Sequence, residues 1–110
     1  MKTTNKILRI WKGWTSTENA PVYEDMLKNE VFPEVVRKGV SGLEKVSIST
    51  LRDNNEVEFF LVLQFDGLDS VKAFAGEDYE AAYIPDNAKR VLLRYETTAR
   101  HYELLDELIF

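Results

Sequence analysis

His101 is the only histidine in the sequence of 110 residues, and it is the most direct candidate for proton transfer. Histidine is the one side chain whose ordinary pKa lies near neutrality, so it can act as a general base at physiological pH. Its neighbours Ala99 and Glu103 share its face of a predicted strand, because side chains alternate along a strand. We predict that His101 is the catalytic base; the alternative is a structural histidine that bonds Glu103 or a backbone carbonyl.

Two charged residues within predicted strands, Arg9 and Glu103, are predicted to line a substrate pocket beside His101. Ionised side chains are rarely buried without a partner, which makes both of them candidates for ligand contacts. The first and last strands of the predicted sheet are neighbours, so Trp11 or Arg9 should come within reach of His101. The alternative is that Arg9 and Glu103 pair with each other across the strands.

Three aromatic residues, Trp11, Trp14 and Tyr83, complete the predicted pocket and would exclude water from it. Trp11 and Trp14 are three positions apart on a strand and therefore point to opposite faces, so at most one of them lines a given pocket. Tyr83 lies four positions after Tyr79, close to Gly76, where a lid could form. For each aromatic the alternative is packing in the core.

Several kinds of chemistry find no support in the sequence. One histidine and no cysteine exclude thiol nucleophiles and the usual transition-metal sites, so we expect no metal. No G-x-S-x-G elbow is present. The glycines match neither a dinucleotide-binding fingerprint nor a phosphate-binding loop, and we expect no cofactor. The glycines are Gly13, Gly39, Gly42, Gly67 and Gly76.

The charge of −5 makes binding to nucleic acid or to an anionic membrane surface unfavourable. The apolar run 59–63 is far too short to span a membrane. Residues 1–6 lack the apolar core of a signal peptide, so a cytoplasmic protein is expected. We predict no nucleic-acid partner and no membrane partner.

The periodicity predicts a single α+β domain over residues 1–110. Helices are expected after an Asn19 cap with Pro21 in the first turn, kinked or ended by Pro33, and after a turn at 66–70 as far as Gly76. A helical turn is predicted at 78–83 and an amphipathic helix at 88–95. The predicted strands are 6–14, 43–52, 56–65 and 97–104. This order predicts a ferredoxin-like βαββαβ fold, an antiparallel sheet with its helices on one face.

The strand 56–65 indicates a homodimer, because it is apolar on both faces. Phe60 and Val62 fall on the face that helices cannot cover, and leaving such side chains in water would lose roughly 1.5–3 kcal/mol each. A second copy of the same face is the simplest cover. The apolar tail 105–110 is predicted to pack on the partner, with packing on its own domain or partial disorder as the alternatives.

Five stretches of the chain resemble small members of the antibiotic biosynthesis monooxygenase superfamily, which are dimeric α+β barrel proteins. They are 11–15 (WKGWT) with Glu18, 31–33 (VFP) with Gly42, 56–59 (EVEF), 74–79 (FAGEDY) and 99–104 (ARHYEL). The resemblance implies a homodimer with two sheets face to face and a pocket between sheet and helices in each subunit. It also implies oxidation of an aromatic substrate by dioxygen without a cofactor. The catalytic sets of the haem-degrading and quinone-forming relatives have no counterpart here, so no catalytic residue is carried over.

The sequence therefore leaves three hypotheses. The first is a cofactor-independent monooxygenase acting on a small apolar or aromatic molecule, with His101 as base. The second is a non-catalytic homodimeric module that binds a small hydrophobic ligand. The third is a pocket filled by side chains. An open cavity of roughly 300 Å³ or more near His101 would favour the first two.

Overall fold

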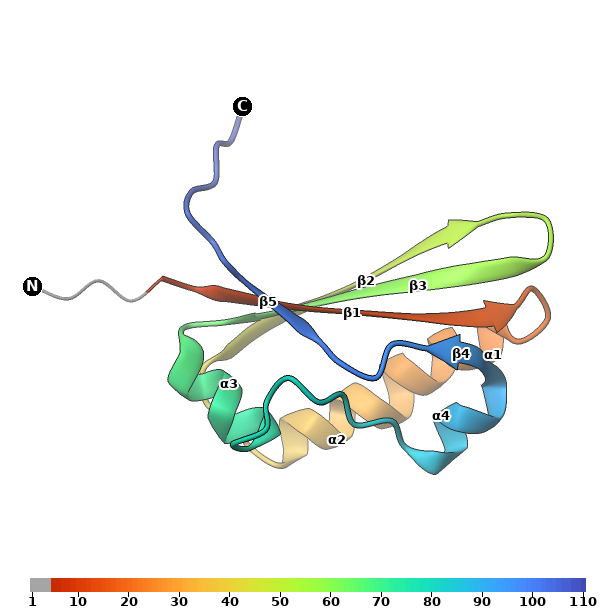
Figure 1. Cartoon of the computed structure of the whole chain (residues 1–110), viewed down its shortest axis with the longest axis horizontal. Coiled ribbons are helices and arrows are strands. Elements are labelled where there is room, and N and C mark those ends of the chain that lie inside the picture. Colours follow the sequence, from red (N-terminus) through yellow and green to blue (C-terminus); the bar gives the residue numbers. More distant parts are fainter. Residues whose placement is uncertain (1–4) are drawn as a thin grey trace, which may run out of the picture.

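The structure, a computed structural model, describes residues 5–110 as one antiparallel sheet with its helices on one face (Figure 1). The strands are β1 (Ile7–Ser16), β2 (Leu43–Arg52), β3 (Glu56–Phe65), β4 (Leu92–Tyr95) and β5 (Arg100–Glu103). The helices are α1 (Ala20–Met26), the π-helical η1 (Leu27–Val31), α2 (Phe32–Arg37), α3 (Leu68–Ala75) and α4 (Asp86–Val91). The sheet order is β2-β3-β1-β4, and β5 also pairs with β1. The predicted α+β, ferredoxin-like arrangement is confirmed.

Alternation along β1 and β3 places the core on the helix side of the sheet. In β1 every second position is buried, and Ile7, Arg9 and Trp11 lie on that side as predicted. The two strands pair antiparallel along their whole length, so their buried faces coincide. The core residues of β3 are Val57, Phe59, Leu61, Leu63 and Phe65.

The first helical region runs through Pro33 instead of ending there. α1 begins directly after Asn19 with Pro21 in its first turn, although the Asn19 side chain makes no capping hydrogen bond. The helix then widens into η1, where the Phe32 N–H donates to the Leu27 carbonyl. This wider turn accommodates the proline ring, which would clash with the preceding turn of a regular α-helix. No helix within residues 5–110 is both long enough and apolar enough to cross a membrane.

The predicted helix 88–95 is wrong in its second half. α4 ends at Val91, and Leu92 takes an extended conformation that starts β4. Tyr95 then lies opposite Gly13 on β1. The apolar spacing also fits a helix, but pairing with the edge of β1 satisfies backbone groups there, and this tertiary contact prevails over the local pattern.

Two further predictions at the same edge are corrected. The predicted strand 97–104 is shorter than expected. Of these residues only β5 (Arg100–Glu103) pairs with β1, along Ile7 to Ile10. Residues 78–83 form a single hydrogen-bonded turn, in which the Ala81 N–H donates to the Asp78 carbonyl (3.1 Å), and no helix, since their backbone also bonds to residues 97–99. The Ala82 N–H donates to the Thr97 carbonyl (2.9 Å) and the Ala99 N–H to the Glu80 carbonyl (2.8 Å). The edge strand is thus broken into two pieces joined by a loop.

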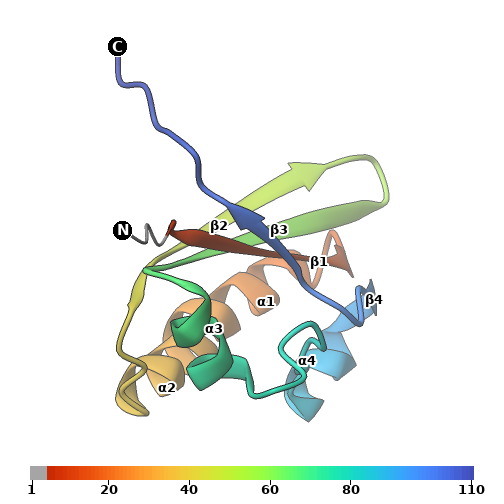
Figure 2. The same ribbon diagram turned by 60° about the vertical axis from the view of Figure 1, so that its left-hand side comes forward.

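The sheet face opposite the helices carries no helix (Figure 2). We call it the open face, and its apolar side chains are Leu8, Ile10, Trp14, Phe60 and Val62, all half-buried. Lys12 lies on the same face opposite Phe60 and forms an ion pair with Glu58 (3.8 Å). A second ion pair, between Arg94 and Glu56 (2.6 Å), lies at the end of these strands.

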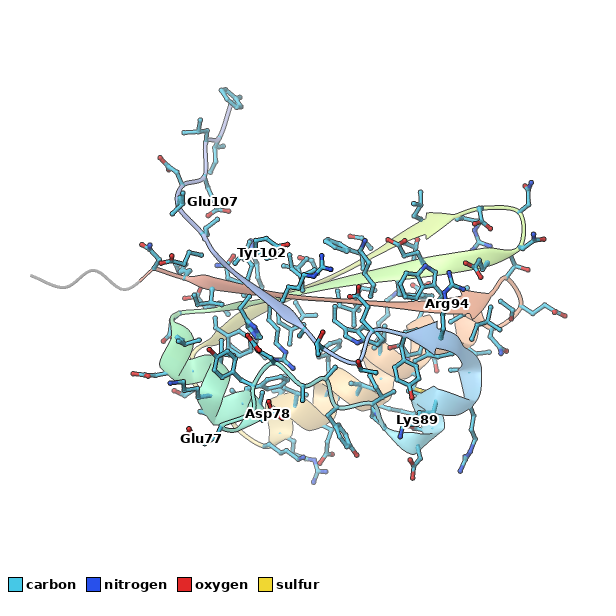
Figure 3. All side chains as sticks on the ribbon, in the orientation of Figure 1. Glu77, Asp78, Lys89, Arg94, Tyr102 and Glu107 are labelled. Carbon is cyan, nitrogen blue, oxygen red and sulfur yellow. The ribbon has the colours of Figure 1, made fainter. Side chains whose placement is uncertain are left out.

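The tail after β5 leaves the domain on the side of the open face (Figures 1 and 2). Tyr102 of β5 and Glu107 of the tail show this direction in Figure 3. The apolar tail side chains Leu105, Leu108, Ile109 and Phe110 are exposed. The tail does not fold back onto its own helices, and its packing on a partner stays a prediction.

Candidate functional site

A cavity of about 670 Å³ lies between the sheet and the helices. Its floor is formed by Arg9 and Trp11 of β1 and by Leu61 and Leu63 of β3, while η1, α2 and the segment 81–85 contribute walls. The volume lies within the roughly 300–1,000 Å³ typical of small-molecule sites, and the few polar groups among apolar side chains are also typical. We call this the main cavity. It is open, so the hypothesis of a pocket filled by side chains is not favoured.

Trp11 is held rigidly in the floor of the main cavity. Its indole Nε1–H donates to the Glu96 carbonyl at 2.7 Å, which satisfies the one polar group of the buried ring. The ring lies on Gly13, where an added Cβ would come within 2.5 Å of the Trp11 Cη2 atom. Glycine at position 13 therefore allows the indole to lie flat against β1.

Within residues 5–110, Arg9 is the one charged side chain of the core, with 7% of its surface exposed. Its Nη1 donates to the Tyr79 carbonyl (2.5 Å) and to His101 Nε2 (3.0 Å), and its Nη2 donates to the Ala81 carbonyl (3.3 Å). The Phe74 ring lies 5.5 Å from the guanidinium carbon. Burial lowers the pKa of Arg9, although arginine remains protonated in proteins. The floor of the main cavity thus carries a fixed positive charge.

His101 lies directly behind Arg9 and not in the main cavity. It lines a separate open groove of about 530 Å³. There the Tyr79 ring packs edge-on against the imidazole, with 5.1 Å between the two ring centres. Because arginine can only donate, Nε2 must be an acceptor, which leaves the imidazole neutral with its proton on Nδ1. Burial, and then the charge of Arg9, lower the pKa of His101 and favour this neutral form.

The register decides the neighbours of the predicted site residues. Arg9 lies opposite His101, whereas Glu103 lies opposite Ile7, so Arg9 and Glu103 do not pair. Glu103 is exposed and accepts a hydrogen bond from Asn5 at 3.1 Å, outside the main cavity. The structure thus joins Arg9 with His101 and leaves Glu103 at the sheet edge.

The predicted aromatic residues are divided between two faces. Trp11 and Tyr83 border the main cavity, Tyr83 as a rim residue with 85% of its surface exposed. Trp14 lies on the open face instead, with the Arg94 guanidinium 4.5 Å from its ring centre. The expectation that the two tryptophans face opposite sides is confirmed.

Tyr23 and Phe74 also line the main cavity, and neither is among the predicted site residues. The Tyr23 ring packs edge-on against the Phe59 ring, with 4.9 Å between the two ring centres. Burial raises the pKa of Tyr23, so its phenol stays protonated at neutral pH. Most charged side chains of the helical side point to solvent, such as Glu77, Asp78 and Lys89 in Figure 3.

The lowered pKa of His101 predicts a pH dependence of folding. Between its lowered value and the ordinary 6.5, the unfolded chain binds more protons than the folded protein. Stability should therefore be complete above pH 6.5 and decline as the pH falls through 6.5 towards the lowered pKa. His101→Gln should flatten this decline, as measured by urea unfolding across about pH 5.5 to 7.5. If stability declines equally with falling pH in the wild-type protein and in His101→Gln, His101 is not the source of the decline.

The sequence matches no protein-family model and no curated protein. Among solved structures the chain is similar to a candidate antibiotic biosynthesis monooxygenase from Bacillus cereus, with a TM-score of 0.67. The match covers 96% of this chain and 99% of that chain at 7% sequence identity. At such identity the likeness is one of fold, and a fold hosts many functions. The chain therefore shares the ferredoxin-like α+β fold of that solved structure.

Proposed function

We propose that the protein is a homodimeric, cofactor-independent monooxygenase that takes up a small apolar or aromatic molecule in the main cavity. The observation that carries the proposal is an open, largely apolar cavity with a buried cation, Arg9, in its floor. Trp11 and Phe74 supply aromatic walls beside this charge. The fold likeness to a candidate monooxygenase supports the same reaction class.

The proposed reaction needs a substrate that can carry a negative charge. A CH₂ group gives up a proton, its carbon transfers electrons to dioxygen, and the carbon ends as a ketone while the second oxygen atom leaves as water: R₂CH₂ + O₂ → R₂C=O + H₂O. Arg9 would stabilise the anion, because a cation in an apolar site acts strongly on developing charge. His101 is the proposed base, and its Nε2 would have to release the hydrogen bond from Arg9 Nη1 (3.0 Å) in order to take up the proton.

The homodimer would form by pairing two open faces. The five apolar side chains of the open face lie half-buried in one chain, and covering side chains of this size is worth roughly 1.5–3 kcal/mol each. Identical faces are self-complementary under two-fold symmetry. The apolar tail leaves each domain on this side and would extend over the partner.

A non-catalytic binding module is the second candidate, and one observation favours it. His101 Nε2 is already engaged by Arg9, and His101 lines the neighbouring groove instead of the main cavity. In that case the protein would hold its ligand without converting it. His101→Gln separates the two functions, because glutamine still accepts from Arg9 but takes up no proton. An oxygenase should lose dioxygen consumption while keeping ligand affinity.

Filling the main cavity should abolish binding of small aromatic molecules. Ala82→Trp introduces an indole at a lining position, and the loss of space should weaken binding of 2-naphthol at least about 10-fold. Calorimetric titration measures the affinity, and an oxygen electrode monitors dioxygen consumption with a panel of phenols and aromatic ketones. Ala73→Trp, on an exposed α3 position outside the cavity, is the matched control. Unchanged binding by Ala82→Trp would refute a ligand site in this cavity.

A further inference from the structure

Arg9 is a buried cation that has no counter-ion in the part of the chain described. Its three hydrogen bonds go to two backbone carbonyls and to the neutral His101. A buried charge without an opposite charge is costly, and this cost falls when a partner of opposite sign arrives. Arg9 is therefore placed to receive an anion.

The acidic side chains that border the main cavity are engaged elsewhere. Glu30 accepts a hydrogen bond from Asn87 at 3.3 Å, and Glu34 forms an ion pair with Arg37. Neither lies within ion-pair distance of Arg9, since no pair between them occurs among residues 5–110 at 4.0 Å or less. The protein thus supplies the cation of a pair but not its anion.

The donors that Arg9 leaves unused match a planar acid group. A guanidinium has five N–H donors, and Nη1 uses both of its own while Nη2 uses one. Nε–H and the second Nη2–H remain, and these two nitrogens form the edge that binds a carboxylate in a bidentate manner. Fully buried side-chain nitrogens without a partner are absent from residues 5–110, so Nε keeps some accessible surface, and Arg9 lines the main cavity.

We infer that the ligand of the main cavity is an apolar or aromatic carboxylic acid whose carboxylate pairs with Nε–H and Nη2–H of Arg9. This inference rests on the proposed function and names the substrate class of that site. The apolar body would lie against Trp11 and Phe74.

A monoanion fits this site better than a phosphate. Among the described residues Arg9 is the one buried cation of the cavity floor, and a phosphate dianion would keep one charge uncompensated for as long as it is bound. With a carboxylate, a second negative charge arises only transiently, when the CH₂ group of the proposed reaction loses its proton. The other cation that borders the cavity, Lys38, is exposed at the far wall, and Glu30 and Glu34 on the same side would repel a second negative charge. The apolar surroundings suit the hydrocarbon part of a carboxylic acid.

The test compares two probes of nearly equal shape, 2-naphthoate and its neutral analogue 2-naphthamide, by calorimetric titration near neutral pH. The wild-type protein should bind 2-naphthoate at least about 10-fold more tightly, since hydrogen bonds to charged groups are the stronger ones. Arg9→Met should lose this preference while still binding 2-naphthamide. Arg9→Lys keeps the positive charge but loses the paired N–H donors of the guanidinium, so it should show an intermediate preference for 2-naphthoate. Lys38→Met is the control and should retain the full preference.

The outcomes separate the two proposals. Equal affinities for both probes in the wild-type protein would overturn the carboxylate and leave ligand binding in the cavity intact. Binding of neither probe would overturn the proposed function and the inference with it. If the preference for 2-naphthoate disappears in Lys38→Met and persists in Arg9→Met, the carboxylate binds Lys38 and the pairing with Arg9 is overturned. If thermal unfolding shows that Arg9→Met does not fold, the wild-type comparison and Arg9→Lys decide.

Discussion

Val62→Asp should convert the proposed dimer into a monomer. Val62 lies on the open face opposite Ile10 of β1 and Ser47 of β2, in the middle of the three longest strands. Two-fold pairing of open faces would bring two carboxylates into one apolar interface, and burying an unpaired charge costs several kcal/mol. The dissociation constant of the dimer should rise at least about 100-fold, which corresponds to the lower end of that cost. Sedimentation equilibrium at several protein concentrations measures it.

The control for this prediction is the same substitution at an exposed helical position. Val36 of α2 is 72% exposed and lies on the helical side, away from the open face. Val36→Asp should therefore leave the dimer unchanged. A wild-type protein that sediments as a monomer at high concentration would refute the homodimer, and so would a Val62→Asp variant that remains dimeric.

Phe59→Ala should destabilise the fold by about 3–5 kcal/mol, the usual cost of removing a fully buried aromatic side chain. Phe59 is 1% exposed and lies on the helix-facing side of β3. Its ring packs edge-on against Tyr23 of α1, so the variant also weakens the contact between helix and sheet. Urea unfolding at a fixed protein concentration measures the loss, because the stability of the proposed dimer would depend on concentration.

Tyr83→Ala serves as the comparison, because it removes a large aromatic side chain that is almost fully exposed. Its effect on the free energy of unfolding should stay within about 0.5 kcal/mol, as is usual for surface positions. If Phe59→Ala were equally mild, the packing of α1 on the sheet could not be the main source of stability. Comparable losses in the free energy of unfolding of both variants would instead indicate that the Tyr83 side chain is buried in solution.

The strands at the centre of the sheet could be predicted because their patterns are strong and mutually consistent. In β1 and β3 the alternation of side chains determines which face is buried, and burial follows it at nearly every position. The opposite directions of Trp11 and Trp14 follow from the same two-residue period. Local periodicity therefore sufficed wherever one face of a strand meets the core.

The edge of the sheet could not be predicted in the same way. Ala88, Val91, Leu92 and Tyr95 fit a helix equally well, and only the unpaired edge of β1 decides that Leu92 begins a strand. The neighbouring first and last strands predicted that Arg9 lies near His101, but their direct pairing depends on strand register, which a sequence pattern does not specify. For the same reason the position of His101 behind Arg9, outside the main cavity, could not be foreseen.

The segment between α3 and α4 closes one side of the main cavity without any regular structure of its own. It is anchored by two backbone hydrogen bonds to residues 97–99 and by Arg9, which binds the carbonyls of Tyr79 and Ala81. Because none of its residues belongs to the central strands, insertions or deletions there would reshape the cavity and leave the sheet intact. Variants that differ in the length of this segment could thus bind different ligands, while the sheet and its packed helices stay the same.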